Sequence, residues 1–112
     1  MNVIWQGDAL SYAIRSFALC STPATVLNVA GSRTISVREV AERFGGRFGV
    51  QPAIVGREAE TALLSDSSLC TRLLGPAEVS EDELFEMTAE WLLKGGTTLG
   101  KPTKFERRDG TY

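Results

Sequence analysis

The sequence predicts an α/β fold, in which a small parallel sheet of about three short strands is flanked by helices. Three short runs of β-branched and aromatic residues alternate with segments whose apolar residues recur at helical spacing. Alternation of strand and helix favours parallel strands joined by helical crossovers. The length of 112 residues, with 43% apolar and 23% charged residues, is that of one ordinary globular domain.

The amino-terminal segment predicts a strand followed by an unusually apolar helix. Residues 3–5 form the expected strand, Gly7 ends it, and Asp8 is a favourable N-cap for a helix of residues 8–20 that ends at Cys20. Arg15 is the only charge in this helix after Asp8. A helix that is apolar most of the way round is normally covered on more than one side. We therefore expect it to contact a protein surface outside this chain.

The middle of the chain predicts a strand, a helix and another strand. Residues 25–29 form the second expected strand, and Ser36 and Glu39 form a capping box that opens a helix. The helix should end at Gly49, and residues 52–55 form the third expected strand. The apolar residues that define one face of this helix are Val37, Val40, Ala41, Phe44 and Phe48.

Two further helices are predicted in the carboxyl-terminal half. A short helix ends at Gly75, and a second capping box, Ser80 with Glu83, opens the last helix. The residues expected to face inward from the last helix are Leu84, Phe85, Thr88, Trp91 and Leu92. Residues 1–96 are thus predicted to form one domain, followed by a polar tail of residues 97–112.

Composition excludes several classes of function. A net charge of −2 gives no electrostatic basis for binding nucleic acid, and no apolar run approaches the roughly 20 residues of a membrane span. Histidine is absent, which removes Ser-His and Cys-His catalysis. Without a secretory signal we expect a cytoplasmic protein, in which Cys20 and Cys70 are small hydrophobic residues. A disulfide between them is the alternative.

Three residues are candidate substrate contacts. Arg57 follows the third expected strand, where loops of α/β proteins commonly meet ligand, and its guanidinium could hold a phosphate at two points. The alternative is a solvated arginine balanced by Glu58 and Glu60. Trp5 and Gln6 end the first expected strand and offer an aromatic face and an amide to a base or sugar, with core packing as the alternative for Trp5.

Two other patterns do not support a catalytic or phosphate site. Residues 95–101 fit the start of a phosphate-binding loop, but Pro102 replaces the hydroxyl residue that ligates magnesium, and the segment follows a helix. The helix macrodipole and helix capping account for the acidic cluster of Glu81, Asp82, Glu83 and Glu86. We therefore predict no catalytic, metal-binding or cofactor-binding residue in this chain.

Several short motifs, taken in order, resemble a known family. Residues 3–9 place Asp8 ahead of an alanine-rich helix, residues 26–31 read Val-Leu-Asn-Val-Ala-Gly, and residues 35–41 read Ile-Ser-Val-Arg-Glu-Val-Ala. Residues 65–75 contain Ser-Asp-Ser-Ser and Leu-Leu-Gly. Over some ninety residues this order is similar to the C-terminal substrate-binding lobe of the extended short-chain dehydrogenases/reductases, the NAD-dependent epimerase/dehydratase family.

The resemblance implies a two-lobed enzyme. Its other, N-terminal lobe would bind NAD or NADP and carry Tyr-x-x-x-Lys catalysis, while this lobe closes over a small-molecule substrate, often a nucleotide-linked sugar. Only Arg57 matches a ligand contact of the family, and Glu58 to Glu60 depart from the Pro-Gly-Asp that follows it there. The sequence thus predicts a lobe that is not catalytic alone. The alternative is a free-standing binding module that forms a homodimer through the helix of residues 8–20.

Overall fold

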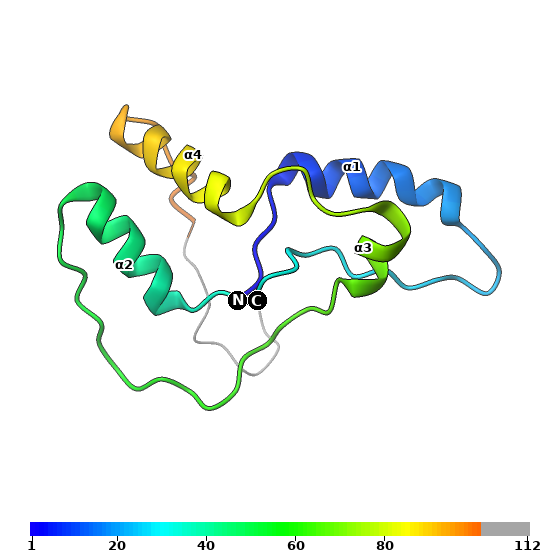
Figure 1. Ribbon diagram of the computed structural model, residues 1–112, viewed down its shortest axis with the longest axis horizontal. Helices are drawn as coiled ribbons and strands as arrows, with labels where there is room; N and C mark the ends of the chain where they lie inside the picture. The colour runs from blue at the N-terminus through cyan, green and yellow to red at the C-terminus, as the bar shows by residue number, and fades with distance from the viewer. Residues whose placement is uncertain (102–112) are drawn as a thin grey trace.

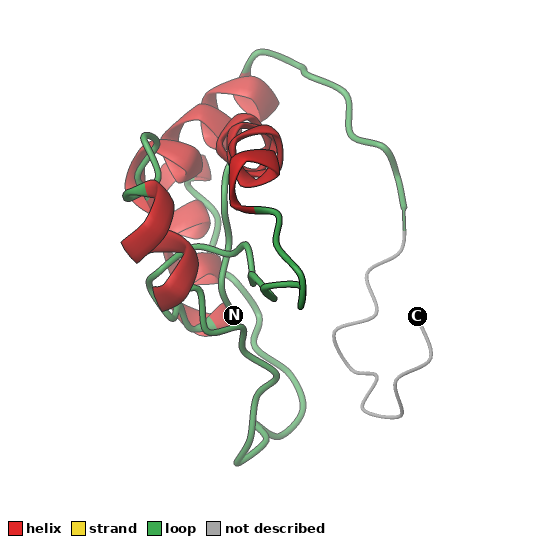
Figure 2. Cartoon of the chain, turned by 90° about the vertical axis from the view of Figure 1, so that its right-hand side faces the viewer, coloured by secondary structure: helices red, strands yellow, loops and turns green. Residues whose placement is uncertain are grey.

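The computed structural model describes residues 1–101, in which helices are joined by long loops (Figure 1). The helical elements are α1 (Gln6–Ser16), the 3₁₀ turn η1 (Phe17–Leu19), α2 (Val37–Phe48), α3 (Ser68–Leu74) and α4 (Glu81–Leu93). Within residues 1–101 no β-strand occurs, as the colours of Figure 2 show. The predicted α/β fold is therefore wrong, and this part of the chain is all-helical.

The three segments predicted as strands are loops because their backbones do not pair with one another. A strand-like contact joins Met1 and Ile35, whose backbone groups exchange hydrogen bonds of 2.6 and 2.8 Å. Asn2 then ends the pairing, since its side-chain amide donates to the carbonyl of Gly31 at 3.2 Å and its Oδ1 accepts from the Ser65 amide at 3.1 Å. A side chain thus takes the bonds that a sheet ladder would need.

The helices form two separate pairs. Helix α1 packs with α3, and α2 packs with α4, as Figure 1 shows. Tyr12, Cys70 and Leu74 form the buried core of the first pair, with Ile4 and Leu19 packed against it. Both cysteines are free thiols, so the alternative of a disulfide is not observed; Cys70 is buried and Cys20 is exposed.

The second pair is held by aromatic contacts. Phe44 of α2 stacks on Phe48 with ring centroids 5.6 Å apart, and it meets Phe85 of α4 edge-on at 5.7 Å. The Arg43 guanidinium lies over the Phe85 ring, 4.6 Å from its centroid. The radius of gyration of 16.4 Å exceeds the roughly 13 Å of a compact domain of about 100 residues. Within residues 1–101, helices contact each other inside each pair and not between the pairs, so the two small cores are not merged into one.

The capping predictions are confirmed in full at α4, in part at α2 and not at α1. Ser80 and Glu83 form the complete capping box of α4, whereas Ser36 caps α2 without the reciprocal bond because Glu39 pairs with Arg33 at 2.5 Å. Helix α1 begins at Gln6, so Asp8 lies in its first turn and is not its N-cap. Trp5 holds the N-cap position without a side-chain hydrogen bond.

The inward face predicted for α4 is only partly correct. Phe85 and Ala89 are buried, but Thr88, Trp91 and Leu92 are exposed because α4 contacts only one other helix. Residues 97–101, the first part of the predicted tail, form a loop after α4. The rest of the predicted tail lies outside the described residues. Within residues 1–101 no helix has both the length and the apolar character needed to cross a membrane.

Candidate functional site

A small cavity of about 180 Å³ lies beside Trp5, where three segments meet. Its walls come from the residues that lead into α1, from the loop at residues 30–32 and from the turn that joins α3 to α4. The side chains of Trp5 and Tyr12 give it aromatic walls, and Glu81 contributes a carboxylate. The cavity therefore offers ring surface together with a few polar groups, which is typical of small-molecule sites.

Two glycines allow the walls of this cavity to approach closely. The Trp5 indole folds back over the first turn of α1, so that a Cβ at Gly7 would lie 2.2 Å from the ring. A Cβ at Gly31 would lie 1.9 Å from the carbonyl oxygen of Val3. Any larger residue at either position would push the walls apart.

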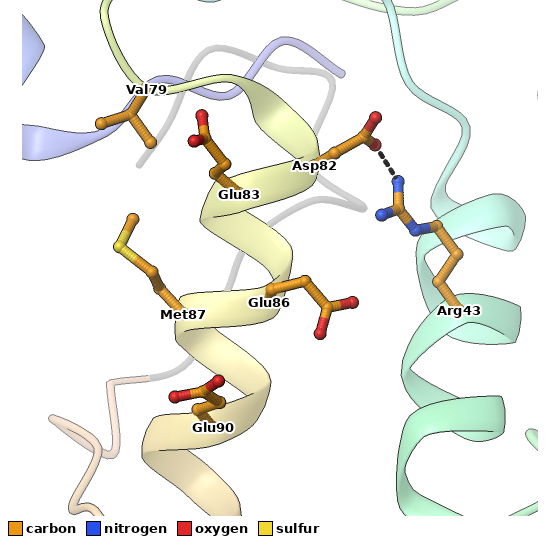
Figure 3. A pocket seen from close by; sticks show the side chains of 7 residues that line it. All are labelled: Arg43, Val79, Asp82, Glu83, Glu86, Met87 and Glu90. Carbon is orange, nitrogen blue, oxygen red and sulfur yellow. Dashed lines mark hydrogen bonds and ion pairs between the residues drawn. The ribbon is translucent and has the colours of Figure 1, made fainter.

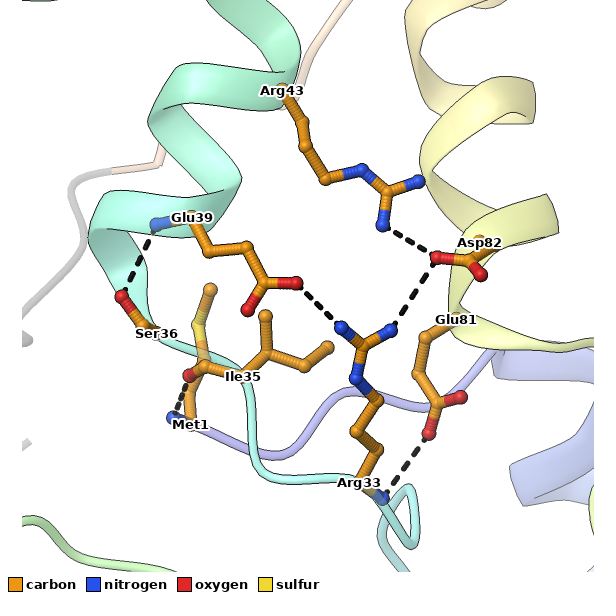
Figure 4. A network of polar contacts seen from close by, with 8 residues as sticks. All are labelled: Met1, Arg33, Ile35, Ser36, Glu39, Arg43, Glu81 and Asp82. Carbon is orange, nitrogen blue, oxygen red and sulfur yellow. Dashed lines mark hydrogen bonds and ion pairs between the residues drawn. The ribbon is translucent and has the colours of Figure 1, made fainter.

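Buried and charged side chains fix the turn that closes the cavity. Asp8 is buried, and its Oδ2 accepts a hydrogen bond of 3.0 Å from the amide of Val79. Figure 4 shows the next contacts along the chain, in which the Arg33 amide donates to Glu81 and its guanidinium contacts Glu39 and Asp82. These contacts connect the cavity wall to both α2 and α4.

The structure does not bring the three predicted contact residues together. Trp5 lines the cavity and is 41% exposed, but Gln6 is exposed at the start of α1 and is not part of the cavity wall. Arg57 is exposed in the loop between α2 and α3, where its neighbour Glu58 pairs with Arg38 at 2.8 Å. Their roles in binding remain predictions.

Three members of the acidic cluster of α4, Asp82, Glu83 and Glu86, line a wide groove of about 740 Å³ together with Glu90. Figure 3 shows Arg43 reaching from α2 to Asp82, and the hydrogen bond and charge of Arg43 lower the pKa of that carboxyl. Glu86 pairs with Arg47, and Glu90 pairs with Lys94. Glu83 instead accepts hydrogen bonds from Ser80. Because the other three carboxylates of the groove have basic partners, the groove has the character of a solvated, largely ion-paired helix face.

The most exposed apolar surface of the first helix pair is one face of α1, continued by the first residue of η1. Leu10, Ile14 and Phe17 follow one another at helical spacing and are 56%, 69% and 76% exposed. On the other side of the helix, Tyr12 is buried and its hydroxyl donates to the Gly75 carbonyl at 2.8 Å. We call Leu10, Ile14 and Phe17 the apolar face of α1.

The side chains that set the orientation of α1 were not found by sequence reasoning. Arg15 donates a hydrogen bond to the carbonyl of Leu74, next to the carbonyl that Tyr12 binds. The last carbonyls of a helix lack a partner within the helix, so α1 caps the carboxyl end of α3. In the sequence, the signal for this contact is the spacing of Tyr12 and Arg15, which places a hydroxyl and a guanidinium three residues apart on one helix.

The loop at Gly31 does not have the form of a dinucleotide-binding loop. A phosphate-binding loop uses glycine to let its backbone approach the pyrophosphate, but the space beside Gly31 is filled by the carbonyl of Val3. That the cofactor implied by the family resemblance binds to a separate lobe stays a prediction. Comparison of the chain with protein-family models, with curated proteins and with solved structures finds no match.

Proposed function

We propose that this chain is the substrate-binding lobe of a two-lobed NAD(P)-dependent epimerase, dehydratase or reductase, and that it acts only together with a dinucleotide-binding lobe. The apolar face of α1 is the observation that carries the proposal. The order of motifs along residues 2–93, described above, supports the same family. In this proposal the apolar face of α1 is the contact surface for the missing lobe.

The energetics of the apolar face favour a protein partner. Full burial of a leucine, isoleucine or phenylalanine side chain is worth about 1.5–3 kcal/mol. From the exposed fractions of Leu10, Ile14 and Phe17, covering this face would contribute about 4 kcal/mol. Contiguous apolar patches of this kind mark interaction surfaces. The same helix is fixed in orientation by Tyr12 and Arg15, so the face is presented in a defined direction.

Exposed apolar side chains in the loops are a second indication of missing cover. Val26, in the segment of residues 26–31 that is similar to the family's Tyr-Asn-Val-Gly strand, is 80% exposed. Val55, just before the loop that holds Arg57, is 88% exposed. The resemblance assigns both segments to the substrate lobe. In this proposal, the partner lobe would cover their exposed valines.

The chain's own part in the reaction would be positioning. Trp5 would hold a flat or sugar ring against its indole, and Arg57 would bind a phosphate, while nicotinamide chemistry belongs to the partner lobe. Holding a substrate in a reactive geometry can contribute several kcal/mol to catalysis without proton transfer by the lobe itself. The substrate class stays the one that the resemblance implies, a small molecule that includes a nucleotide-linked sugar.

The first test is genetic and biochemical. The reading frame that encodes the chain, or an adjacent gene, should encode a lobe with a glycine-rich loop and a Tyr-x-x-x-Lys pair. Purified together, the two parts should form a complex that binds NAD or NADP by calorimetry. Absence of any such encoded lobe would overturn the proposal.

A charge on the apolar face tests the interface. Ile14→Glu replaces a side chain that is 69% exposed, so the chain should stay folded, while loss of about 2 kcal/mol weakens the complex roughly thirtyfold. Leu99→Glu is the matched control, because Leu99 is 87% exposed and lies beyond α4. Equal affinity of the wild type and Ile14→Glu would contradict the proposed role of α1.

The alternative function is a homodimer formed through the same face. Analytical ultracentrifugation of the chain alone separates the two proposals. A tight dimer that Ile14→Glu dissociates, with no effect of Leu99→Glu, would favour the dimerisation module over the two-lobed enzyme.

A further inference from the structure

A second cavity, of about 610 Å³, adjoins the Trp5 cavity and has a different chemical character. It lies between the loop at residues 32–34 and the start of α3, and it shares Ser32 and Thr71 with the Trp5 cavity. Asn2 holds its two sides together, because its side chain bonds the Gly31 carbonyl on one side and the Ser65 amide on the other. The cavity walls are thus fixed by hydrogen bonds.

Hydroxyl groups dominate the wall of this cavity. The hydroxyl side chains that line it without a hydrogen-bond partner within residues 1–101 are Ser32, Thr34, Ser65, Ser67 and Thr71. Ser67 is only 5% exposed. No fully enclosed polar side-chain atom in the described part of the chain lacks a partner, so the Ser67 hydroxyl keeps some exposure, and Ser67 lines the cavity. A nearly buried hydroxyl of this kind is a group that a ligand would satisfy.

The charges in the cavity balance each other. Arg72 and Asp66 both line it. Asp66 accepts hydrogen bonds from the amide and the hydroxyl of Ser68, which lower its pKa, so it is ionised at neutral pH. The Thr71 amide donates to the Ser67 carbonyl. At the start of α3, the amides of Ser68 and Thr71 therefore both have partners and are not free to bind an anion. One cation beside one carboxylate disfavours a phosphate and suits an uncharged ligand.

We propose that this cavity binds a neutral polyhydroxyl compound, such as a cyclic polyol or a monosaccharide. Each serine or threonine hydroxyl both donates and accepts, which matches ligand hydroxyls that do the same. Arg72 would donate to ligand oxygens, and Asp66 would accept from ligand hydroxyls. The proposal does not depend on the two-lobe proposal, since every residue in it belongs to this chain.

The test uses the full chain, with myo-inositol, D-glucose and inorganic phosphate as separate probes. Amide chemical shifts are followed by two-dimensional NMR up to about 50 mM probe, well above a millimolar Kd. We expect saturable shifts from either neutral probe at Asn2, Ser32 and residues 65–72. Shifts from phosphate alone, or no saturable shift with any probe, would overturn the proposal.

Two variants locate the binding. Ser67→Ala and Thr71→Val each remove one neutral hydrogen bond, so each should weaken binding of the neutral probe about fivefold. Thr88→Val is the matched control, because Thr88 lies on α4 and its hydroxyl bonds the Leu84 carbonyl. If the NMR spectrum shows that Ser67→Ala is not folded, the affinity of Thr71→Val alone is compared with that of the wild type. Unchanged affinity in a folded Thr71→Val protein would contradict the assignment.

Discussion

Tyr12→Phe tests how α1 is anchored, on which the orientation of its apolar face depends. The Tyr12 hydroxyl donates to the Gly75 carbonyl at 2.8 Å, at the carboxyl end of α3. The substitution keeps the buried ring but leaves that part-buried carbonyl without its partner, which costs about 1 kcal/mol of unfolding free energy. For a domain of about 100 residues this corresponds to a decrease in Tm of roughly 4 °C or more.

Urea denaturation followed by circular dichroism measures this change. We expect a lower midpoint with an unchanged slope, because the surface exposed on unfolding stays the same. Trp91→Phe is the matched control: its indole N–H donates to the Thr97 carbonyl at an exposed site, and its loss should change the free energy by less than about 0.5 kcal/mol. If Tyr12→Phe unfolds at the wild-type midpoint, water satisfies Gly75 and the hydroxyl does not anchor α1.

Two further predictions concern pH. Hydrogen bonds from the Ser80 amide and hydroxyl lower the pKa of Glu83, so its stabilisation of α4 is present above the usual carboxyl pKa and is lost as the pH falls through the lowered value. Amide shifts at the start of α4 should report this loss, and Glu83→Gln should remove it. Burial, followed by the nearby Cys70 and Asp8, raises the pKa of Tyr12, so urea midpoints should fall as the pH rises above 10.0. A Tyr12→Phe protein that shows the same alkaline decrease would contradict this assignment.

The helices could be predicted because their signals are local. Ser36 and Ser80 each accept a hydrogen bond from an amide three residues away, and Gly49 ends α2 with a φ of 68°. The strands could not, because pairing depends on which segments meet in space. Residues 25–29 have a strand-like composition, yet the side chain of Asn2 contacts the loop that follows them where a ladder would have to form.

The candidate site was predictable only in part for the same reason. The composition of residues 8–20 indicated that the helix needs cover, but not which side its own chain would supply. That side is set by contacts of Tyr12 and Arg15 with residues about sixty positions away. Trp5 and Arg57 were predicted as contacts because each lies near the carboxyl end of an expected strand. Residues 1–101 form no sheet, so these two strand ends are not brought together.

In the two-lobe proposal, stability and function depend on the same surface, the apolar face of α1. Each helix pair buries only a few side chains, and cores of this size support marginal stability at best. A partner that binds the apolar face of α1 binds the folded chain and not the unfolded one, so its binding free energy adds to the free energy of unfolding. In the proposed complex, covering this face would therefore raise the free energy of unfolding above that of the isolated chain.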